Sequence, residues 1–194
     1  MITHIEGKLI EKKPTYVIVD VNGIGYKIKI SLQTFSLINS EKCRLFTHLS
    51  IKEDSHTLFG FFNENERYLF RDLISVSGVG PSTAQVILST YSTEEIIAHI
   101  ISANVSAVQS VKGIGAKTAQ RIIIDLKDKV GKGLPSSDLL FDKMDNTIKE
   151  EALSALIALG FAKKVADNKI SKVLKLNPEI GSVEELVKTA LSQL

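Results

Sequence analysis

The 194-residue sequence has a single cysteine, no tryptophan and no long apolar run. One cysteine excludes an internal disulfide and any zinc site built from several cysteines. No apolar stretch approaches the roughly 18 residues of a membrane-spanning helix. The opening MITHIEGKLIE also lacks the basic start and apolar core of a signal peptide. We therefore expect a cytoplasmic protein that does not enter a membrane.

The chain also lacks an excess of either charge. It carries 24 Lys and Arg residues against 22 Asp and Glu residues, a net charge of +2. This balance excludes a uniformly basic surface, so any binding to nucleic acid depends on a local cluster of basic residues. One local basic cluster is present between Lys112 and Lys129. Its basic members are Lys112, Lys117, Arg121, Lys127 and Lys129, and its acidic members are Asp125 and Asp128.

Residues 1–63 are expected to form a barrel of short strands. Runs rich in Ile, Val, Phe and Thr predict strands at Ile5–Glu11, Tyr16–Val21, Tyr26–Ile30, Cys43–Ile51 and Thr57–Phe62. Asn22-Gly23 is a strong hairpin signal because both residues tolerate positive φ. Five short strands in about sixty residues favour a small closed barrel such as the OB-fold.

From Glu64 onward the apolar residues follow helical spacing, which predicts an all-α domain over residues 64–130. Pro81 suits the first turn of a helix. Ser92 with Glu95 forms a capping box, and Asn104 can cap the next helix. The longest predicted helix is amphipathic and covers Ala116–Val130.

Residues 131–146 read GKGLPSSDLLFDKMDN, a composition that indicates a flexible linker. Residues 147–194 predict three helices, broken at Gly160 and at Asn177-Pro178. A module of about 48 residues is near the lower limit for an independent core, so we expect it to be supported by a partner. The predicted fold class is therefore α+β multidomain, with a barrel, a helical domain, a linker and a small helical module.

The most informative feature is an internal repeat at an offset of 35 residues. LISVSGVGPSTAQVIL at residues 73–88 aligns with VQSVKGIGAKTAQRII at residues 108–123, and eight of the sixteen pairs are identical. Each copy predicts a helix, a Gly-apolar-Gly turn and a second helix. Two such copies indicate a tandem helix-hairpin-helix domain.

Each repeat has the chemistry of a phosphate site. The glycines permit a tight turn without a Cβ in the way of an approaching group. We expect Val79 and Ile114 to be buried anchors that leave free N–H groups at the start of the following helix, where the helix dipole favours an anion. Lys117 and Arg121 add charge beside the second turn. Contacts of this kind bind the nucleic-acid backbone without reading its sequence.

Features of the sequence also bear on three other functions. GIGAKT at residues 113–118 resembles a P-loop, but Ala116 separates the glycine from the lysine and a helix precedes the turn, so an ATPase is not expected. A base-excision glycosylase needs stacking aromatics and a catalytic carboxylate outside the motif, whereas this chain has no Trp and Asp125 lies within the motif's own helix. An adaptor that binds proteins through the C-terminal module alone remains an alternative.

The order of these parts resembles the RuvA family of Holliday-junction-binding subunits of the bacterial RuvAB branch-migration complex. The resemblance extends over the whole chain, and its most specific stretches are FTHLSIKEDSHTLFGF, LISVSGVGP and VKGIGAKTAQRIIIDLKDK. It implies an OB-fold barrel, tandem helix-hairpin-helix motifs and a UBA-like three-helix module. It also implies a non-catalytic scaffold for branch migration in recombination and DNA repair.

The resemblance further implies partners and site residues. The partners are four-way junction DNA, the RuvB ATPase motor, a junction resolvase and further copies of the chain in a tetramer or octamer. ATP and Mg²⁺ would be used by the motor, and this chain would hold no cofactor or metal. The implied DNA-binding residues are Gly78, Val79, Gly80, Ser82, Thr83, Gly113, Ile114, Gly115, Lys117, Thr118 and Arg121. Glu53 and Asp54 would form an acidic pin at the junction centre, and Leu156, Leu159 and Phe161 would contact the motor.

Two positions depart from the family pattern. Ser82 and Ala116 stand where family members often carry lysines, which predicts a weaker grip on phosphate or compensation by Lys27 and Lys29.

Some of these residues have simpler explanations. Without the resemblance, Glu53-Asp54 is most simply a solvated turn. Its adjacent carboxylates could suggest a metal site with His48 and His56 nearby, but no recognised ligand spacing appears. Cys43 is expected to be a core residue, and His99 is expected to be structural.

Overall fold

The computed structural model describes residues 2–130, 144–177 and 180–192. The chain divides into two compact units, Met1–Leu134 and Pro135–Leu194. The predicted linker at residues 131–146 lies outside the described residues except for its last three positions. Those three positions are helical, because the first helix of the second unit begins at Met144.

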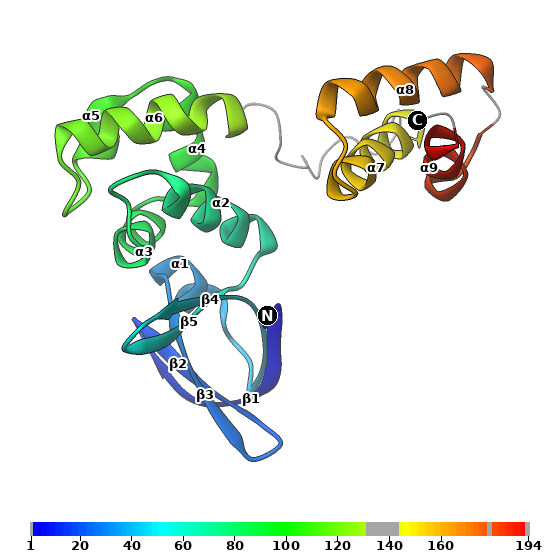
Figure 1. Ribbon diagram of the computed structural model, residues 1–194. Coiled ribbons are helices and arrows are strands. Elements are labelled where there is room, and N and C mark those ends of the chain that lie inside the picture. The colour runs from blue at the N-terminus through cyan, green and yellow to red at the C-terminus, as the bar shows by residue number, and fades with distance from the viewer. Residues whose placement is uncertain (1, 131–143, 178–179, 193–194) are drawn as a thin grey trace. The chain divides into compact units, whose positions relative to one another are not determined.

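The first unit opens with a closed five-stranded barrel (Figure 1). The strands follow the order β1-β2-β3-β5-β4 around it, and β4 pairs with β1 to close it. All pairs are antiparallel except β3 with β5. The strand bounds are β1 His4–Lys13, β2 Tyr16–Val21, β3 Ile24–Ile30, β4 Lys42–Lys52 and β5 Ser55–Phe61. The predicted OB-fold barrel is confirmed.

The β2–β3 turn has the predicted geometry. Asn22 has φ of 52° and Gly23 has φ of 88°, the pair of positive angles that a two-residue hairpin favours. Alternation places Ile28 and Ile30 in the barrel core and leaves Lys27 and Lys29 exposed. Cys43 lies in the same core, as predicted.

A short helix, α1 (Leu32–Leu37), connects β3 to β4 and was not predicted. Ser31 caps it by accepting a hydrogen bond from the backbone N–H of Thr34.

Five helices complete the unit, at α2 Glu64–Ser75, α3 Pro81–Thr90, α4 Thr93–Ile101, α5 Val105–Gln109 and α6 Ala116–Val130. The predicted first-turn proline, the Ser92 capping box and the Asn104 cap are all present. Helices α2 and α3 lie next to the barrel, with α5 and α6 on their far side (Figure 1). The ring of His99 packs edge-on against Tyr91, which is a structural contact.

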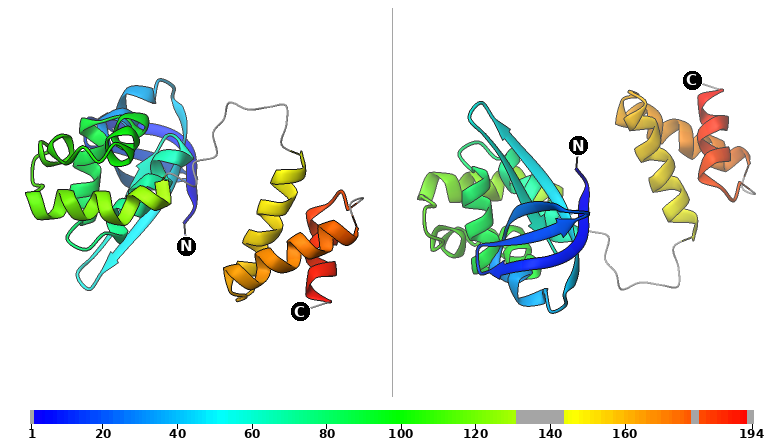
Figure 2. Two further views of the ribbon diagram at one scale, coloured as in Figure 1. Left: turned by 90° about the horizontal axis from the view of Figure 1, so that it is seen from above. Right: turned by 90° about the horizontal axis from the view of Figure 1, so that it is seen from below.

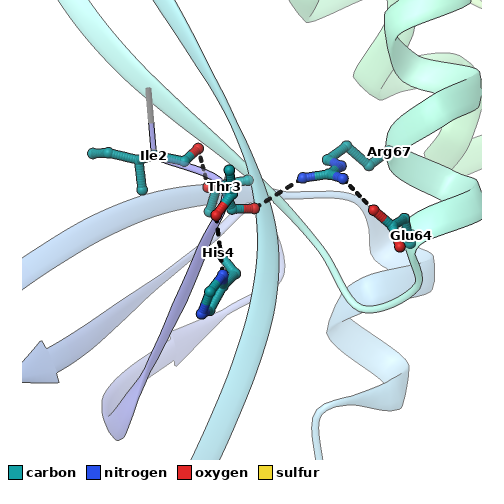
Figure 3. Close-up of polar contacts among 6 residues, drawn as sticks. Ile2, Thr3, His4, Glu64 and Arg67 are labelled. Atoms are coloured by element: carbon teal, nitrogen blue, oxygen red, sulfur yellow. Dashed lines mark hydrogen bonds and ion pairs between the residues drawn. The ribbon is translucent and has the colours of Figure 1, made fainter. Parts of the chain in front are cut away.

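A hydrophobic core separate from the one inside the barrel joins β5 to the helices. Phe59 and Phe61 of β5 face outward from the barrel and pack on Phe70 of α2, with ring centroids 5.1 and 4.9 Å apart. On another side, the Arg67 guanidinium of α2 donates a hydrogen bond to the carbonyl of Thr3, the residue before β1, and another to Glu64 of its own helix (Figure 3). These contacts hold the helices in a fixed position on the barrel.

A buried carboxylate forms a third connection between the barrel and the helices. Glu66 of α2 is 3% exposed and accepts hydrogen bonds from the hydroxyls of Ser31 and Thr34, the latter at 2.7 Å. Burial raises the pKa of this carboxyl, and the hydrogen bonds from Ser31, Thr34 and the Phe62 backbone oppose the rise.

The described part of the second unit forms three helices, as predicted, at α7 Met144–Ala158, α8 Lys163–Leu176 and α9 Val183–Leu191. Gly160 turns the chain after α7 with φ of 99°. A separate core of Ala, Leu, Ile and Val side chains joins the three helices. No helix in the described part of the chain is both long and apolar enough to cross a membrane.

Candidate nucleic-acid interface

The two repeats adopt the same loop geometry. In each loop a four-residue turn is closed by a backbone hydrogen bond, from Val79 to Val76 at 3.0 Å and from Ile114 to Val111 at 3.1 Å. The third residue of each turn is a glycine in the left-handed region, Gly78 with φ of 92° and Gly113 with φ of 91°. A positive φ at this position is typical of a type II turn and explains the first glycine of each loop.

Val79 and Ile114 are the buried anchors that the sequence predicts, with 5% and 6% of their surface exposed. Both side chains join the shared core, while the residues on either side of them are exposed. The anchors therefore fix each loop while its backbone faces solvent.

Each loop leads directly into a helix whose first N–H groups are available. In α3 the first hydrogen-bonded backbone N–H is that of Ala84, and in α6 it is that of Ala119. Each donates to the carbonyl of the second glycine in the preceding loop. The earlier N–H groups of both helices have no partner within the helix. In α3 these belong to Ser82 and Thr83, because Pro81 has no N–H. In α6 they belong to Ala116, Lys117 and Thr118.

The second glycine of each loop has a different role from the first. Neither Gly80 nor Gly115 has a positive φ, and a Cβ built on either meets no atom within 4 Å. The expectation of left-handed dihedrals therefore holds only for Gly78 and Gly113. The open space at Gly80 and Gly115 is what close approach of an external group requires.

The two loops lie next to each other. Arg121 of α6 donates from Nη1 to the carbonyl of Ser77 in the first loop, at 3.2 Å. A Cβ on Gly78 would lie 3.8 Å from the Thr118 hydroxyl. Lys129 extends the contact by donating to the Ser75 hydroxyl at 3.4 Å. The repeat does not predict this contact, because it joins side chains of one copy to the backbone of the other.

The surface beside the loops is positively charged mainly at the second one. Lys112, Lys117 and Arg121 are exposed there. At the first loop the equivalent positions are Ser77, Ser82 and Val86, which carry no charge. The second loop therefore offers the stronger anion site.

Glu53 and Asp54 occupy the two-residue turn between β4 and β5, where Lys52 pairs with Ser55. Both are exposed, and the hairpin that carries them extends beyond the rest of the barrel (Figure 2). Two carboxylates at the end of an extended hairpin form a local negative surface.

The proposed metal site at this turn receives no support from the geometry. His48 packs against Phe70 with ring centroids 5.4 Å apart, and burial, Arg71 and Arg67 lower its pKa. Within residues 2–130, 144–177 and 180–192, no three His, Cys, Asp or Glu side chains come together to hold an ion.

The C-terminal candidates differ in exposure. Leu156 is fully buried in the three-helix core, so it presents no surface to a partner and its assignment as a contact is corrected. Phe161 is partly buried against the same core. Leu159 directly follows α7, is 61% exposed and is the strongest candidate.

Comparisons with known proteins agree along the whole chain. The family described as RuvA N terminal domain matches residues 1–60, the SAM-like helix-hairpin-helix tandem matches residues 70–128, and the RuvA C-terminal domain matches residues 147–194. A curated protein of Christiangramia forsetii, named Holliday junction branch migration complex subunit RuvA, is 56% identical over the full length of both chains. Proteins of the same name from Flavobacterium psychrophilum and Bacteroides fragilis are 49% and 41% identical, again over both full lengths.

Proposed function

This chain belongs to the RuvA family, and from that premise we propose that it binds four-way DNA junctions and acts as a scaffold for branch migration. In this role it holds the junction open and recruits the RuvB ATPase during homologous recombination and repair. The chain binds and orients DNA, and it breaks no bond. The motor hydrolyses ATP and uses Mg²⁺ to do so.

The observation that carries the proposal is the pair of matched loops. Two type II turns, each fixed by a buried anchor, aim unpaired helix N–H groups at solvent, and exposed basic side chains lie beside the second turn. Such groups bind phosphate oxygens through the backbone and the helix dipole. They contact no base edge, which suits a protein that must bind junctions of any sequence.

The acidic turn adds the second element of the mechanism. Glu53 and Asp54 repel phosphates, so at the centre of an assembly they would keep strands apart and direct them into new pairings. A tetramer provides four such turns and four pairs of loops, one for each arm. We propose a tetramer or octamer in the cytoplasm, with a junction resolvase as a further partner.

The C-terminal module is the proposed docking site for the motor. Leu159 offers an exposed leucine beside the partly buried Phe161. An apolar side chain at the centre of an interface contributes strongly when its partner provides a matching pocket.

The test is ATP-dependent branch migration of a four-way junction by the full chain with RuvB. The wild-type chain is expected to stimulate migration, and Leu159→Asp is expected to bind the junction normally but lose the stimulation. Leu176→Asp is the matched control, because Leu176 is equally exposed in the same module at 64%. No stimulation by the wild-type chain would contradict the proposal.

A further inference from the structure

Two exposed lysines of the barrel have no role in the site described so far. Lys27 and Lys29 follow the outward alternation of β3, while Ile28 and Ile30 fill the core. The Lys27 ammonium lies 4.4 Å from the centre of the Tyr16 ring, and that of Lys29 lies 5.9 Å from the centre of the Phe59 ring. Both ammonium groups are thus held over the same outer face of the barrel.

The nearby carboxylates are engaged elsewhere. Glu11 accepts a hydrogen bond from the Tyr16 hydroxyl at 3.1 Å and pairs with Lys13, and Asp20 accepts from the backbone N–H of Gly23. Within the described residues, no carboxylate lies within ion-pairing distance of Lys27 or Lys29. Their charge is therefore available to an external anion.

Contacts of α3 place these lysines near the first loop. The Gln85 side chain donates to the Ile30 carbonyl at 2.6 Å, and one turn later the Ser89 hydroxyl accepts from the Leu32 N–H at 3.1 Å. Helix α3 thus runs in the same direction as the chain from Ile30 to Leu32. Its first residues, which include Ser82, therefore lie toward the part of β3 that precedes Ile30, where Lys29 is found.

The strand register places the same lysines on the path to the acidic turn. Lys29 pairs with Phe59 of the parallel strand β5. Toward the N-terminal ends of both strands, β3 continues past Lys27, and β5 begins at Ser55, which adjoins Asp54. Lys27 and Lys29 thus occupy the stretch of surface between the first loop and the acidic turn.

We propose that Lys27 and Lys29 form a phosphate-binding strip for the duplex arm that enters the first loop. The strip provides the positive charge that the first loop lacks at Ser77 and Ser82. Its ligand is the sugar-phosphate backbone of double-stranded DNA, bound without regard to sequence. The inference rests on the proposed junction binding and adds a contact surface on the barrel to it.

The test measures the affinity of the full chain for a four-way junction over a range of salt concentrations. Each lost phosphate contact lowers the slope of log K against log salt by about 0.9. Lys27→Gln with Lys29→Gln is therefore expected to lower the slope by about 1.8 for each subunit that contacts the junction, and to weaken binding at least roughly tenfold at moderate salt. Lys27→Arg with Lys29→Arg keeps both charges and is expected to retain the wild-type slope.

The matched control is Lys8→Gln with Lys42→Gln. These two exposed lysines pair with each other across β1 and β4. Their substitution removes the same charge from another part of the barrel. Provided that the wild-type chain prefers junctions, either of two results would overturn the inference. One is a wild-type salt slope in the Lys27→Gln, Lys29→Gln variant. The other is an equal loss of slope and affinity in the control variant. If the wild-type chain shows no such preference, the proposed function fails instead.

Discussion

At the scale of single residues, the two glycines of each loop serve different purposes. Gly113 has φ of 91°, which costs an alanine about 1–2 kcal/mol, whereas Gly115 has an ordinary backbone and open space around it. Gly113→Ala is therefore expected to lower the melting temperature and to weaken junction binding. Gly115→Ala is expected to keep the melting temperature within about a degree and still weaken binding, because the new Cβ hinders a phosphate.

Thermal unfolding and junction titration of both variants separate these effects. Gly25→Ala is a useful control, since Gly25 is an exposed barrel glycine whose added Cβ would only touch Ile18 at 3.6 Å. Junction affinity unchanged in Gly115→Ala would contradict the phosphate role of the second glycine.

Glu66 predicts a pH dependence of stability. Its raised pKa means that the folded protein keeps the proton to a higher pH than the unfolded chain does. Between the ordinary carboxyl pKa, about 4.3, and the raised value, the free energy of unfolding therefore falls as pH increases. Glu66→Gln does not titrate, so the difference in melting temperature between wild type and variant should change across this window. If the melting temperatures of wild type and Glu66→Gln changed in parallel with pH, the raised pKa of Glu66 would be contradicted.

Glu66 also shows what single-sequence reasoning misses at this scale. Its partners are more than thirty positions away, at Ser31, the N-cap of α1, and at Thr34 within α1, a helix that was not predicted. The residue occupies an amphipathic helix where a glutamate ordinarily faces solvent. Only the packing of α1 against α2 makes it a buried acceptor.

At the scale of elements, the sequence predicts strands and caps well because their signals are local. The Asn22-Gly23 turn, the Ser92 capping box and the start of α6 at Ala116 all match the structure. Helix α1 was missed because six residues are too few to show a helical period. Leu156 was misjudged because helical spacing identifies the apolar residues of α7 without showing which of them the other two helices cover.

The acidic turn between β4 and β5 provides a prediction at this scale. Replacing Glu53 by Gln and Asp54 by Asn removes repulsion toward phosphates, so junction binding should be unchanged or tighter while motor-driven migration is altered. Gel shift measures the first effect, and a branch-migration assay measures the second. Glu6→Gln with Glu41→Gln removes two other exposed carboxylates from the barrel and serves as the control. A collapse of binding in the turn variant would show that these carboxylates are structural.

At the scale of the whole molecule, the repeat predicts two loops but not how they are combined. The structure joins them through Arg121, whose guanidinium bonds to the Ser77 carbonyl and keeps further N–H groups for a ligand. It also joins the barrel to the helices through one core that includes Phe59, Phe61 and Phe70. These long-range contacts bring the loops, the β3 lysines and the acidic turn into one compact unit, which no local pattern in the sequence indicates.

The central claim is that this unit recognises a four-way junction rather than DNA in general. Its most direct test is a gel-shift competition at fixed salt, with a labelled four-way junction against linear duplex of the same sequence. The account predicts a preference of several orders of magnitude for the junction, because only the junction engages the loops of several subunits at once. Equal, weak binding to both DNAs would contradict it and leave a generic binder of the duplex backbone.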